Sequence, residues 1–443
     1  MKLYALCVLA AVLTVSDAFG QKEVSGIYAG GHIRRGRPAT ITKLRNSGFT
    51  YLILFNVNVE ADGTLTTDGE TICKDGQYVF QETQPYYQQD VADLKAEHSS
   101  ISRIEICIGG WGNGSYGNIR NLVNSSGTGR TSILYRNFKA LKDAVPEIDA
   151  VNNDTEQDYD AETAAKFHVM LYGLGYKTTI APYTNMSYWT SLVSKIRASR
   201  PRAVDRAMIQ CYDGGAGNLG SVGSWNFTGV TERHPGLLNY SNDWSVERNL
   251  AQFQAWKDQG VATGGFVWVY NDGYDETWDL NAWASGLNRI FESVTVPEDE
   301  VAVRCYSEKN YQGYCVSLPA GRFSQGDLAV YGLKANDLSS IEIVDDLYLI
   351  KLYKTPEFTG TAITRKKSYK TLSTWDNVVC SIVIEPNPDA VRDVKGTTPA
   401  TAEGEGTISN LAGQRIDKSR FTTHNSQLKR GIYIVDGKKI LKN

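Results

Sequence analysis

The residues whose types and spacing best suggest chemistry lie in the segment IDAVNNDTE, where Asn152, Asp154 and Glu156 occupy alternate positions. Alternate residues of a β-strand point to one face, so these three side chains are expected to point together. A neighbouring negative charge raises the pKa of a carboxyl group, which would suit Glu156 to general acid catalysis. Asp158 and Asp160 follow closely, and such a composition is also typical of a polar loop after a strand. The spacing alone leaves both interpretations open.

Composition narrows the chemistry that the chain can support. The sequence has 443 residues, of which 42% are hydrophobic and 21% are charged, with a net charge of −3. These values exclude a disordered, collagen-like or coiled-coil chain, and they give no indication of nucleic-acid binding. The five histidines are scattered, which argues against a histidine-based metal site. Aromatic residues are abundant, with 9 Trp and 25 Tyr, and exposed rings often form platforms for sugars or interfaces.

The elements that must position these residues alternate between strand and helix from Val24 to about Phe291. This alternation predicts a parallel sheet with crossover helices, and roughly 270 residues suffice for a (β/α)8 barrel. An open doubly wound sheet is the alternative, but no glycine-rich dinucleotide turn follows the first strand, so we predict the barrel. The expected strands are 26–30, 51–59, 104–110, 148–151, 178–182, 207–212 and 265–270, with a weak eighth near 225–230; the expected helices include 89–96, 132–144, 161–174, 187–199 and 246–258.

Four motifs in this region resemble the barrel of family 18 glycoside hydrolases, the chitinases and endo-β-N-acetylglucosaminidases. That family's fourth strand carries D-x-x-D-x-D-x-E, and this chain has D-x-x-N-x-D-x-E from Asp149 to Glu156. CIGGW resembles the third-strand S-x-G-G motif, with Cys107 in place of serine. QCYD at 210–213 resembles the sixth-strand motif, and Trp268 in GFVW takes the place of the last-strand tryptophan. The motifs occur in the family's order.

This resemblance implies substrate-assisted cleavage of β-linked N-acetylglucosaminides. Glu156 would protonate the leaving glycosidic oxygen while the substrate's own acetamido oxygen attacks the anomeric carbon. Asp154 would orient the acetamido N–H group, Tyr212 would hydrogen-bond the acetamido oxygen, and Trp268 would form the floor beneath the sugar. The resemblance implies a glycan containing N-acetylglucosamine as the partner, and no cofactor for catalysis. The further candidates for substrate binding are Asn152, Gln210, Asp213 and Trp111.

Two substitutions distinguish this chain from the family pattern. Asn152 replaces the middle acid, and an amide cannot share a proton with Asp154 as a carboxyl group can. Cys107 replaces a serine and so removes a strong hydroxyl partner from the same neighbourhood. Asp154 and Glu156 are both present, which favours an active hydrolase. The alternative is a lectin or adhesin whose degenerate barrel binds glycans without cleaving them.

Residues 297–386 show a different pattern, in which short apolar runs alternate with Gly, Asn and Asp turns and helices are not expected. CYSEKNYQG and LYKTPEFTG share one spacing of two aromatic residues and a glycine, and Ser340 and Ser381 follow late in the two copies. The doubled pattern resembles the βγ-crystallin Greek-key domain and implies a two-sheet sandwich. Calcium sites of that family use Asn, Asp and Ser side chains, although each copy here lacks one ligand and the same residues also suit turns. The candidate calcium ligands are Asn336, Ser339, Asp376 and Asn377.

The two ends of the chain suggest export. Residues 1–20 combine Lys2, an apolar run and small residues at Ala18 and Gly20, as in a signal peptide cleaved before Gln21. The apolar run is too short to span a bilayer, so we expect no transmembrane span and a secreted or cell-surface protein. Residues 387–406 have the composition of a linker. Residues 407–443 resemble the C-terminal sorting tails of exported Bacteroidetes proteins, which would permit attachment to the cell surface; a small β-hairpin appendage is the alternative.

The predicted organisation is therefore α/β: a signal peptide, a (β/α)8 TIM barrel over 21–296, an all-β Greek-key sandwich over 297–386, a linker and a short β tail. Six cysteines remain after removal of the signal peptide, and export permits disulfides. Their spacing establishes no pairing; if one disulfide forms, we expect Cys305–Cys315.

Overall fold

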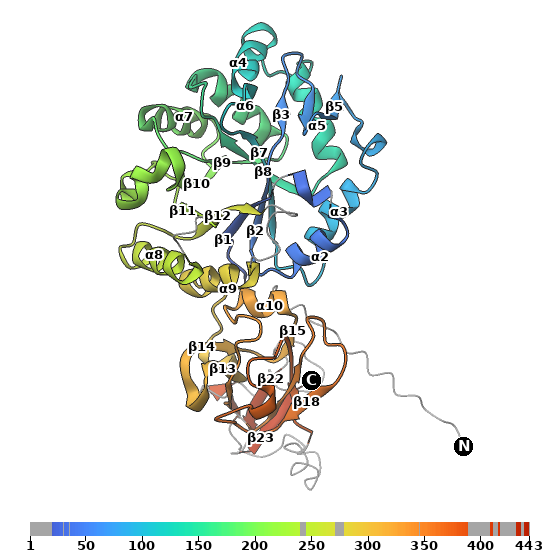
Figure 1. The fold of residues 1–443 in the computed structure, drawn as a ribbon, viewed down its shortest axis with the longest axis vertical. Helices are drawn as coiled ribbons and strands as arrows, with labels where there is room; N and C mark the ends of the chain where they lie inside the picture. The colour runs from blue at the N-terminus through green and yellow to red at the C-terminus, as the bar shows by residue number, and fades with distance from the viewer. Residues whose placement is uncertain are drawn as a thin grey trace, which may run out of the picture.

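The computed structural model shows a barrel ringed by helices and a smaller β-rich body next to it (Figure 1). It describes residues 20–29, 31–34, 36–239, 245–270, 279–344, 346–388, 408–410, 415–416, 431–435 and 438–442. The predicted signal peptide, apart from Gly20, and the predicted linker after residue 388 lie outside the described residues.

Eight parallel strands close into the predicted barrel, in the order β1-β12-β11-β10-β9-β8-β7-β2. Counted along the chain, the four motifs lie on or directly after the third, fourth, sixth and eighth barrel strands, which are β7, β8, β10 and β12, as the resemblance implies. The strands are β1 (Ser25–Ala29), β2 (Tyr51–Leu54), β7 (Arg103–Gly109), β8 (Ile148–Asp154), β9 (Lys177–Ile180), β10 (Val204–Gln210), β11 (Glu232–Leu238) and β12 (Gly265–Tyr270).

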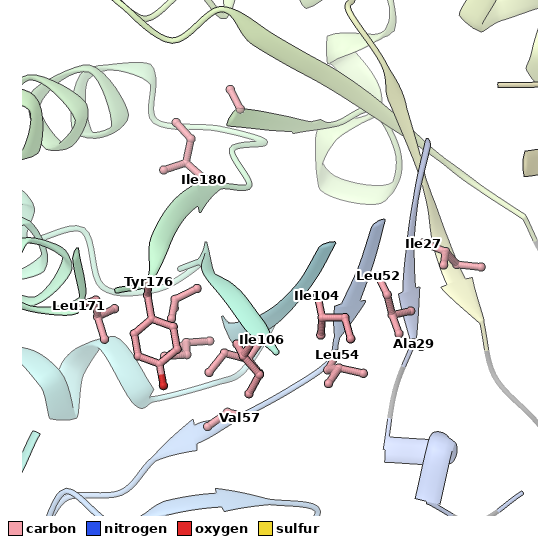
Figure 2. Close-up of a cluster of buried hydrophobic side chains, with 14 of the residues drawn as sticks. Ile27, Ala29, Leu52, Leu54, Val57, Ile104, Ile106, Leu171, Tyr176 and Ile180 are labelled. Atoms are coloured by element: carbon pink, nitrogen blue, oxygen red, sulfur yellow. The ribbon is translucent and has the colours of Figure 1, made fainter. Parts of the chain in front are cut away.

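Helices cover the outside of the barrel because every second strand residue is apolar and points outward. Figure 2 shows Ile27, Leu52, Ile104 and Ile106 in this outer layer, all buried. Several helices begin at a side chain that accepts a hydrogen bond from the first turn, as Ser132 and Asp160 do. The helices are α2 (Ala39–Arg45), α3 (Tyr87–Leu94), α4 (Ser115–Ser126), α5 (Ile133–Ala144), α6 (Ala161–Gly173), α7 (Met186–Ser199), α8 (Val246–Asp258) and α9 (Leu280–Phe291).

The prediction of a weak strand near 225–230 is wrong, because the barrel strand in this part of the chain is β11, which begins at residue 232. Trp225 lies in the preceding turn with its indole buried. The sequence of β11 is ERHPGLL, whose charges, proline and glycine conceal a strand pattern. Its glycine has a packing reason, since a Cβ at Gly236 would meet the ring of Phe266 at 2.1 Å.

A small antiparallel sheet between β2 and α3 is missing from the sequence prediction, which extends a single strand to residue 59. Asp68-Gly69 and Asp75-Gly76 form its tight turns, with positive φ at all four residues. Asp-Gly between strands is a strong hairpin signal and could have revealed this sheet. It consists of β3 (Asn58–Val59), β4 (Leu65–Thr67), β5 (Glu70–Lys74) and β6 (Gln77–Tyr78).

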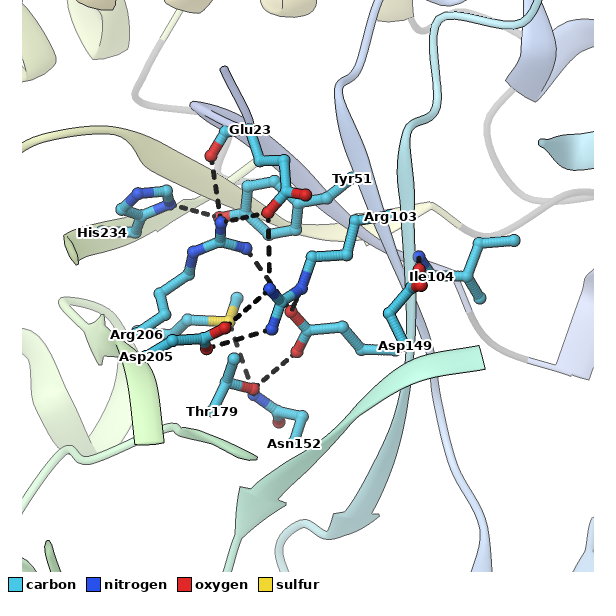
Figure 3. A network of polar contacts seen from close by, with 12 residues as sticks. Glu23, Tyr51, Arg103, Ile104, Asp149, Asn152, Thr179, Asp205, Arg206 and His234 are labelled. Carbon is cyan, nitrogen blue, oxygen red and sulfur yellow. Dashed lines mark hydrogen bonds and ion pairs between the residues drawn. The ribbon is translucent and has the colours of Figure 1, made fainter. Parts of the chain in front are cut away.

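A buried network of charged side chains lies inside the barrel, in the amino-terminal halves of the strands (Figure 3). Glu105 accepts a hydrogen bond from Arg103 Nε at 2.7 Å and lies 3.4 Å from Arg206. Arg103 also binds Asp205 at 2.9 Å, and Arg206 binds Glu23 at 2.9 Å. Buried charges persist only when they are paired, so the network fixes β7 and β10 relative to the start of β1.

Two antiparallel sheets form the second body, as predicted, in the orders β14-β13-β16 and β15-β19-β17-β18. The two copies exchange strands, because β15 pairs with β19 and Tyr369 bridges Ile341. The expectation that helices are absent is wrong at α10 (Gln325–Val330), which a capping box begins. The strands are β13 (Val303–Glu308), β14 (Gln312–Leu318), β15 (Gly321–Phe323), β16 (Ser340–Ile343), β17 (Tyr348–Tyr353), β18 (Ala362–Arg365) and β19 (Ser381–Pro386).

The internal repeat has the same geometry in both copies. The rings of Tyr306 and Tyr311 lie 5.5 Å apart, and the corresponding rings of the second copy lie 6.0 Å apart. The late serine of each copy donates a hydrogen bond to a backbone carbonyl, at 2.6 Å from Ser340 and 2.7 Å from Ser381. The repeated spacing therefore corresponds to two equivalent corners of one sandwich.

The expected Cys305–Cys315 disulfide is wrong, because both cysteines are free. In the pairing of β13 with β14, Cys305 lies opposite Val316 and Tyr306 lies opposite Cys315. Successive strand residues point to opposite faces, so Cys305 enters the core while Cys315 is exposed.

The barrel and the sandwich share a buried polar contact centred on Asn288 of α9. Its Oδ1 accepts a hydrogen bond from the Ser25 hydroxyl at 2.7 Å. Its Nδ2 donates to the carbonyl of Gly48 at 2.7 Å and to that of Ala329 at 2.8 Å. The backbones approach closely here, since a Cβ at Gly48 would lie 2.3 Å from the Ala329 Cβ. The side chain therefore links three segments from two bodies.

Four short strands form a separate antiparallel sheet in the tail, in the order β21-β20-β22-β23. Short strands agree with the β tail that the sequence predicts. Within the described ranges, no helix has both the length and the apolar character needed to cross a membrane. The strands are β20 (Ile408–Asn410), β21 (Arg415–Ile416), β22 (Gly431–Val435) and β23 (Lys438–Lys442).

Candidate active site

The carboxyl-terminal ends of β8, β10 and β12 bring the main site candidates together, at the end of the barrel where enzymes of this fold act. Asp154 is the last residue of β8, and Glu156 follows in the loop rather than on the strand. Gln210 ends β10, Tyr212 follows it, and Trp268 lies on β12. Residues far apart in the sequence therefore lie together at the carboxyl-terminal end of the barrel.

Asp154 is buried and held by a neighbouring amide. Gln210 Nε2 donates a hydrogen bond to Asp154 Oδ1 at 2.8 Å, whereas Cys107 Sγ lies 3.9 Å from Oδ2. Burial, and then the charge of Glu156, raise the pKa of Asp154 well above its ordinary value, while the bond from Gln210 opposes the rise. Gly109 permits the close approach of β7, since a Cβ there would meet the Asp154 carbonyl oxygen at 2.2 Å.

Glu156 is half-buried beside the same amide. Burial raises its pKa, a hydrogen bond with Gln210 lowers it, and the charge of Asp213 raises it further. Asp213 is exposed, with φ +44° in the turn after β10. Gln210 thus contacts both carboxyl groups, and a carboxyl with a raised pKa suits proton donation near neutral pH.

Aromatic rings form an apolar surface beside the two carboxyl groups. Tyr212 stacks on Trp268, with ring centroids 6.3 Å apart and planes at 22°. Phe55 meets Trp268 edge-on at 4.8 Å, and the ring of Tyr28 lies 5.1 Å from it. Burial, and then the charges of both carboxyl groups, raise the pKa of Tyr212. An apolar wall with polar groups at its edge suits a sugar ring.

Asn152 lies on the inner face of β8, as the spacing predicts, but its hydrogen bonds go to residues other than the two carboxyl groups. The Tyr28 hydroxyl donates to its Oδ1 at 3.0 Å, and its Nδ2 donates to Thr179 Oγ1 at 2.8 Å. Asp149, at the other end of β8, pairs with Lys95 at 2.8 Å and so has a structural role.

Trp111 follows β7 and is 89% exposed. Its loop is fixed to the small antiparallel sheet, because Asn113 Nδ2 donates to Asn58 Oδ1 at 2.5 Å. The indole therefore presents its faces to solvent from an anchored loop, an arrangement that suits stacking on a sugar.

Four aromatic residues near the site escape the sequence analysis: Tyr28, Phe55, Tyr159 and Tyr183. Burial, the neighbouring Tyr183 and the charges of both carboxyl groups raise the pKa of Tyr159. No spacing rule connects these rings to the carboxylate motif. The available signal is position, since Tyr183 directly follows the strand predicted over 178–182.

Three of the calcium candidates lie close together, but a lysine already neutralises their acid. Ser339 Oγ donates to Asn377 Oδ1 at 3.2 Å. Asp376 Oδ2 pairs with Lys309 at 2.9 Å, and the proximity of Ser339 and Lys309 lowers the pKa of this carboxyl group. Its buried Oδ1 has no hydrogen-bond partner among the described residues. The Lys309 ammonium thus competes with a cation for one of the two carboxylate oxygens of Asp376.

The fourth calcium candidate, Asn336, accepts a hydrogen bond from the thiol of Cys380 at 3.2 Å. Thiols suit softer metals than calcium. In the part of the chain that the structure describes, no group of three or more His, Cys, Asp or Glu residues could hold a metal ion. Calcium binding by Asn336, Ser339, Asp376 and Asn377 therefore stays a prediction.

No protein-family model and no curated protein matches the sequence. Among solved structures, the chain is similar to the N-terminal domain of Protein S, with 28% identity over 19% of this chain and 97% of that chain, at a TM-score of 0.19. A βγ-crystallin domain from Flavobacterium johnsoniae is 28% identical over 22% of this chain and 99% of that chain, at a TM-score of 0.19. One from Clostridium beijerinckii is 25% identical over 19% of this chain and 95% of that chain, at 0.18.

Proposed function

We propose that the barrel is a glycoside hydrolase that cleaves β-linked N-acetylglucosaminides, such as those of chitin, N-glycans or peptidoglycan, with retention of configuration. The observation that carries the proposal is the pair of neighbouring carboxyl groups after β8, with Asp154 held by Gln210 and its pKa raised by the charge of Glu156. Tyr212 and Trp268 provide an aromatic surface beside it. An acid, an assisting carboxylate and a floor for the sugar are what substrate-assisted catalysis requires.

The first step uses a proton on Glu156. Burial and the charge of Glu156 raise the pKa of Asp154, and burial raises the pKa of Glu156, so both carboxyl groups hold a proton more readily than free carboxyl groups do. A substrate acetamido N–H that donates to Asp154 favours the charge there and the proton on Glu156. Glu156 passes this proton to the glycosidic oxygen as the C1–O bond breaks and the acetamido oxygen bonds to C1.

The second step returns the proton and releases the sugar. Water attacks C1, the bond from C1 to the acetamido oxygen breaks, and Glu156 accepts the proton of the water. Asp154 stabilises the positive charge of the oxazolinium intermediate until then. Two successive inversions at C1 give net retention. None of these steps requires a metal or an organic cofactor.

A glycan-binding protein without hydrolase activity is the second candidate. Two observations favour it: Asn152 is hydrogen-bonded to Tyr28, Thr179 and Met208 rather than to Asp154, and the thiol of Cys107 makes only a long contact with Asp154. Both weaken the polar support that the family's active site receives. Binding would then use the same aromatic surface.

Incubation with chitin oligomers, N-glycoproteins and peptidoglycan distinguishes the two candidates. We expect the wild-type protein to release N-acetylglucosamine-terminated products and Glu156→Gln to release none. Glu162→Gln is the matched control, because Glu162 is on the outer helix α6 and pairs with Lys195 at 2.7 Å. Binding without cleavage in all three proteins would support the lectin and refute the hydrolase.

We further propose that the protein is exported and that its tail mediates surface attachment. The signal-like residues 1–20 and the sorting-like residues 407–443 support this location. Cell fractionation with and without residues 407–443 tests it. Intracellular retention of the complete chain would refute export, and unchanged surface attachment without the tail would refute its role.

A further inference from the structure

A chain of hydrogen bonds connects the buried charge network to the aromatic surface of the site, and Asn152 and Thr179 are visible in it in Figure 3. Thr179 Oγ1 donates to Glu105 Oε2 at 2.5 Å, and Asn152 Nδ2 donates to Thr179 Oγ1 at 2.8 Å. The Tyr28 hydroxyl then donates to Asn152 Oδ1 at 3.0 Å. All four side chains are buried, and the Tyr28 ring lies 5.1 Å from Trp268.

The donor and the acceptor of each hydrogen bond in this series follow from which atoms carry hydrogens. A threonine hydroxyl has one hydrogen, and Glu105 takes it. Burial raises the pKa of Glu105, and the charges of Arg103 and Arg206 oppose this rise. Its Oε1 pairs with both guanidinium groups, at 2.7 Å and 3.4 Å, as an ionised carboxylate does. Thr179 can therefore only accept from position 152, which must supply a donor. An amide supplies one at every pH, whereas an ionised carboxylate has none.

We propose that Asn152 is a positioning residue whose neutral amide, selected by Thr179 and Glu105, holds the Tyr28 hydroxyl in one arrangement at every pH. A role for Asn152 in catalysis rests on the proposed function, in which Tyr28 supports Trp268 beneath the sugar. The requirement for a hydrogen-bond donor at position 152 is independent of that function. An aspartate at this position would complete the chain only as a carboxylic acid, with its O–H group donating to Thr179.

The groups around position 152 make an ionised aspartate still less favourable. Asp154 is a carboxyl group on the same strand, and Glu105 is one on the neighbouring strand β7. The guanidinium groups of Arg103 and Arg206 are already bound to Glu105, Glu23 and Asp205. Among the described residues, the titratable and charged groups facing this interior include Tyr28, Tyr51, Arg103, Glu105, Cys107, Asp154, Arg206, Tyr212 and His234.

Thermal unfolding of full-length Asn152→Asp and wild type between pH 4 and pH 8 tests the inference. The folded variant must bind a proton that the unfolded chain releases above a pKa of about 4, so its stability falls as pH rises. We expect its folding equilibrium constant to fall about tenfold per pH unit relative to wild type, until the folded pKa is passed. Near pH 4, where the acid is protonated, the two proteins should have similar melting temperatures.

Asn153→Asp is the matched control on the same strand. Asn153 Oδ1 already accepts from the backbone N–H of Thr155 at 3.1 Å, and its Nδ2 lies 3.0 Å from His168 Nε2. An aspartate there has a backbone donor, and His168 can change tautomer to provide a second. We therefore expect a much smaller pH dependence for this variant, although it also introduces a buried acid.

A second pair of variants tests the role of Thr179 without an added acid. Thr179→Ser keeps the hydroxyl and should retain the wild-type melting temperature, whereas Thr179→Val should lower it by several degrees. The inference is overturned if Asn152→Asp follows wild type or Asn153→Asp across the pH range, if it does not fold near pH 4, or if serine and valine at position 179 behave alike. If the wild-type protein has no hydrolase activity but Asn152→Asp shows the expected pH dependence of stability, the proposed function alone is refuted.

Discussion

The side chain of Asn288 provides the sharpest test of how the barrel and the sandwich stabilise each other. Asn288→Ala removes three buried hydrogen bonds, with Ser25, Gly48 and Ala329. The Ser25 hydroxyl keeps a contact with Thr50 at 3.2 Å, and the Ala329 carbonyl keeps the N–H of residue 332 at 3.0 Å. Because alternative partners remain, we take about 1 kcal/mol per lost bond, which lowers the free energy of unfolding by about 3 kcal/mol.

Thermal and urea unfolding measure this effect. An unfolding entropy of about 2.1 cal/mol/K per residue over roughly 370 residues converts about 3 kcal/mol into a decrease in melting temperature of about 4 °C. Asn121→Ala on α4 is the control, since Asn121 is exposed and its truncation should change stability by less than about 0.5 kcal/mol. Indistinguishable melting curves for the two variants would show that the contact contributes no stability and would refute the reasoning.

Three further predictions concern the site, the barrel interior and the sandwich. Hydrolysis of an aryl N-acetylglucosaminide should decline as pH rises through the elevated pKa of Glu156, because the acid must be protonated; a rate that increases across that range would contradict its role. Gly236→Ala should lower the free energy of unfolding by about 1–3 kcal/mol, measured in urea, because the new Cβ overlaps the Phe266 ring; unchanged stability would contradict this packing. Lys309→Ala should free Asp376 and give a larger increase in melting temperature with added calcium than wild type shows; equal increases would count against the ion pair as a competitor.

The parts of the barrel that the sequence predicts are those in which local pattern and tertiary position agree. Most strands are apolar runs, because both faces of a barrel strand are buried, and the sequence predicts these strands close to their observed positions. β11 departs from this rule, since its interior positions carry a histidine and a glycine that only the neighbouring strands explain. The Cys305–Cys315 pairing fails for a similar reason, since strand register rather than distance along the chain decides which side chains meet.

In the candidate site too, the sequence predicts what depends on local spacing and misses what depends on contacts between strands. Spacing along β8 correctly places Asn152 and Asp154 on one inner face, because the period of a strand is a local property. It does not reveal the hydrogen bonds of Asn152, because its partners Tyr28 and Thr179 come from other strands. Nor does it reveal the position of Tyr159, whose contacts depend on the loop that follows β8.

The position of the sandwich explains why stability and chemistry are expected to be separable in this chain. Ser25 begins β1 and Gly48 precedes β2, so Asn288 joins the sandwich to the amino-terminal ends of the strands. Asp154 and Glu156 lie at the opposite, carboxyl-terminal ends, where barrel enzymes place their chemistry, whereas the amino-terminal face usually serves stability. Removing the Asn288 amide should therefore lower the melting temperature while leaving the pH profile of any hydrolase activity unchanged. A shifted pH profile in Asn288→Ala would show instead that the contact reaches the carboxyl groups through the barrel.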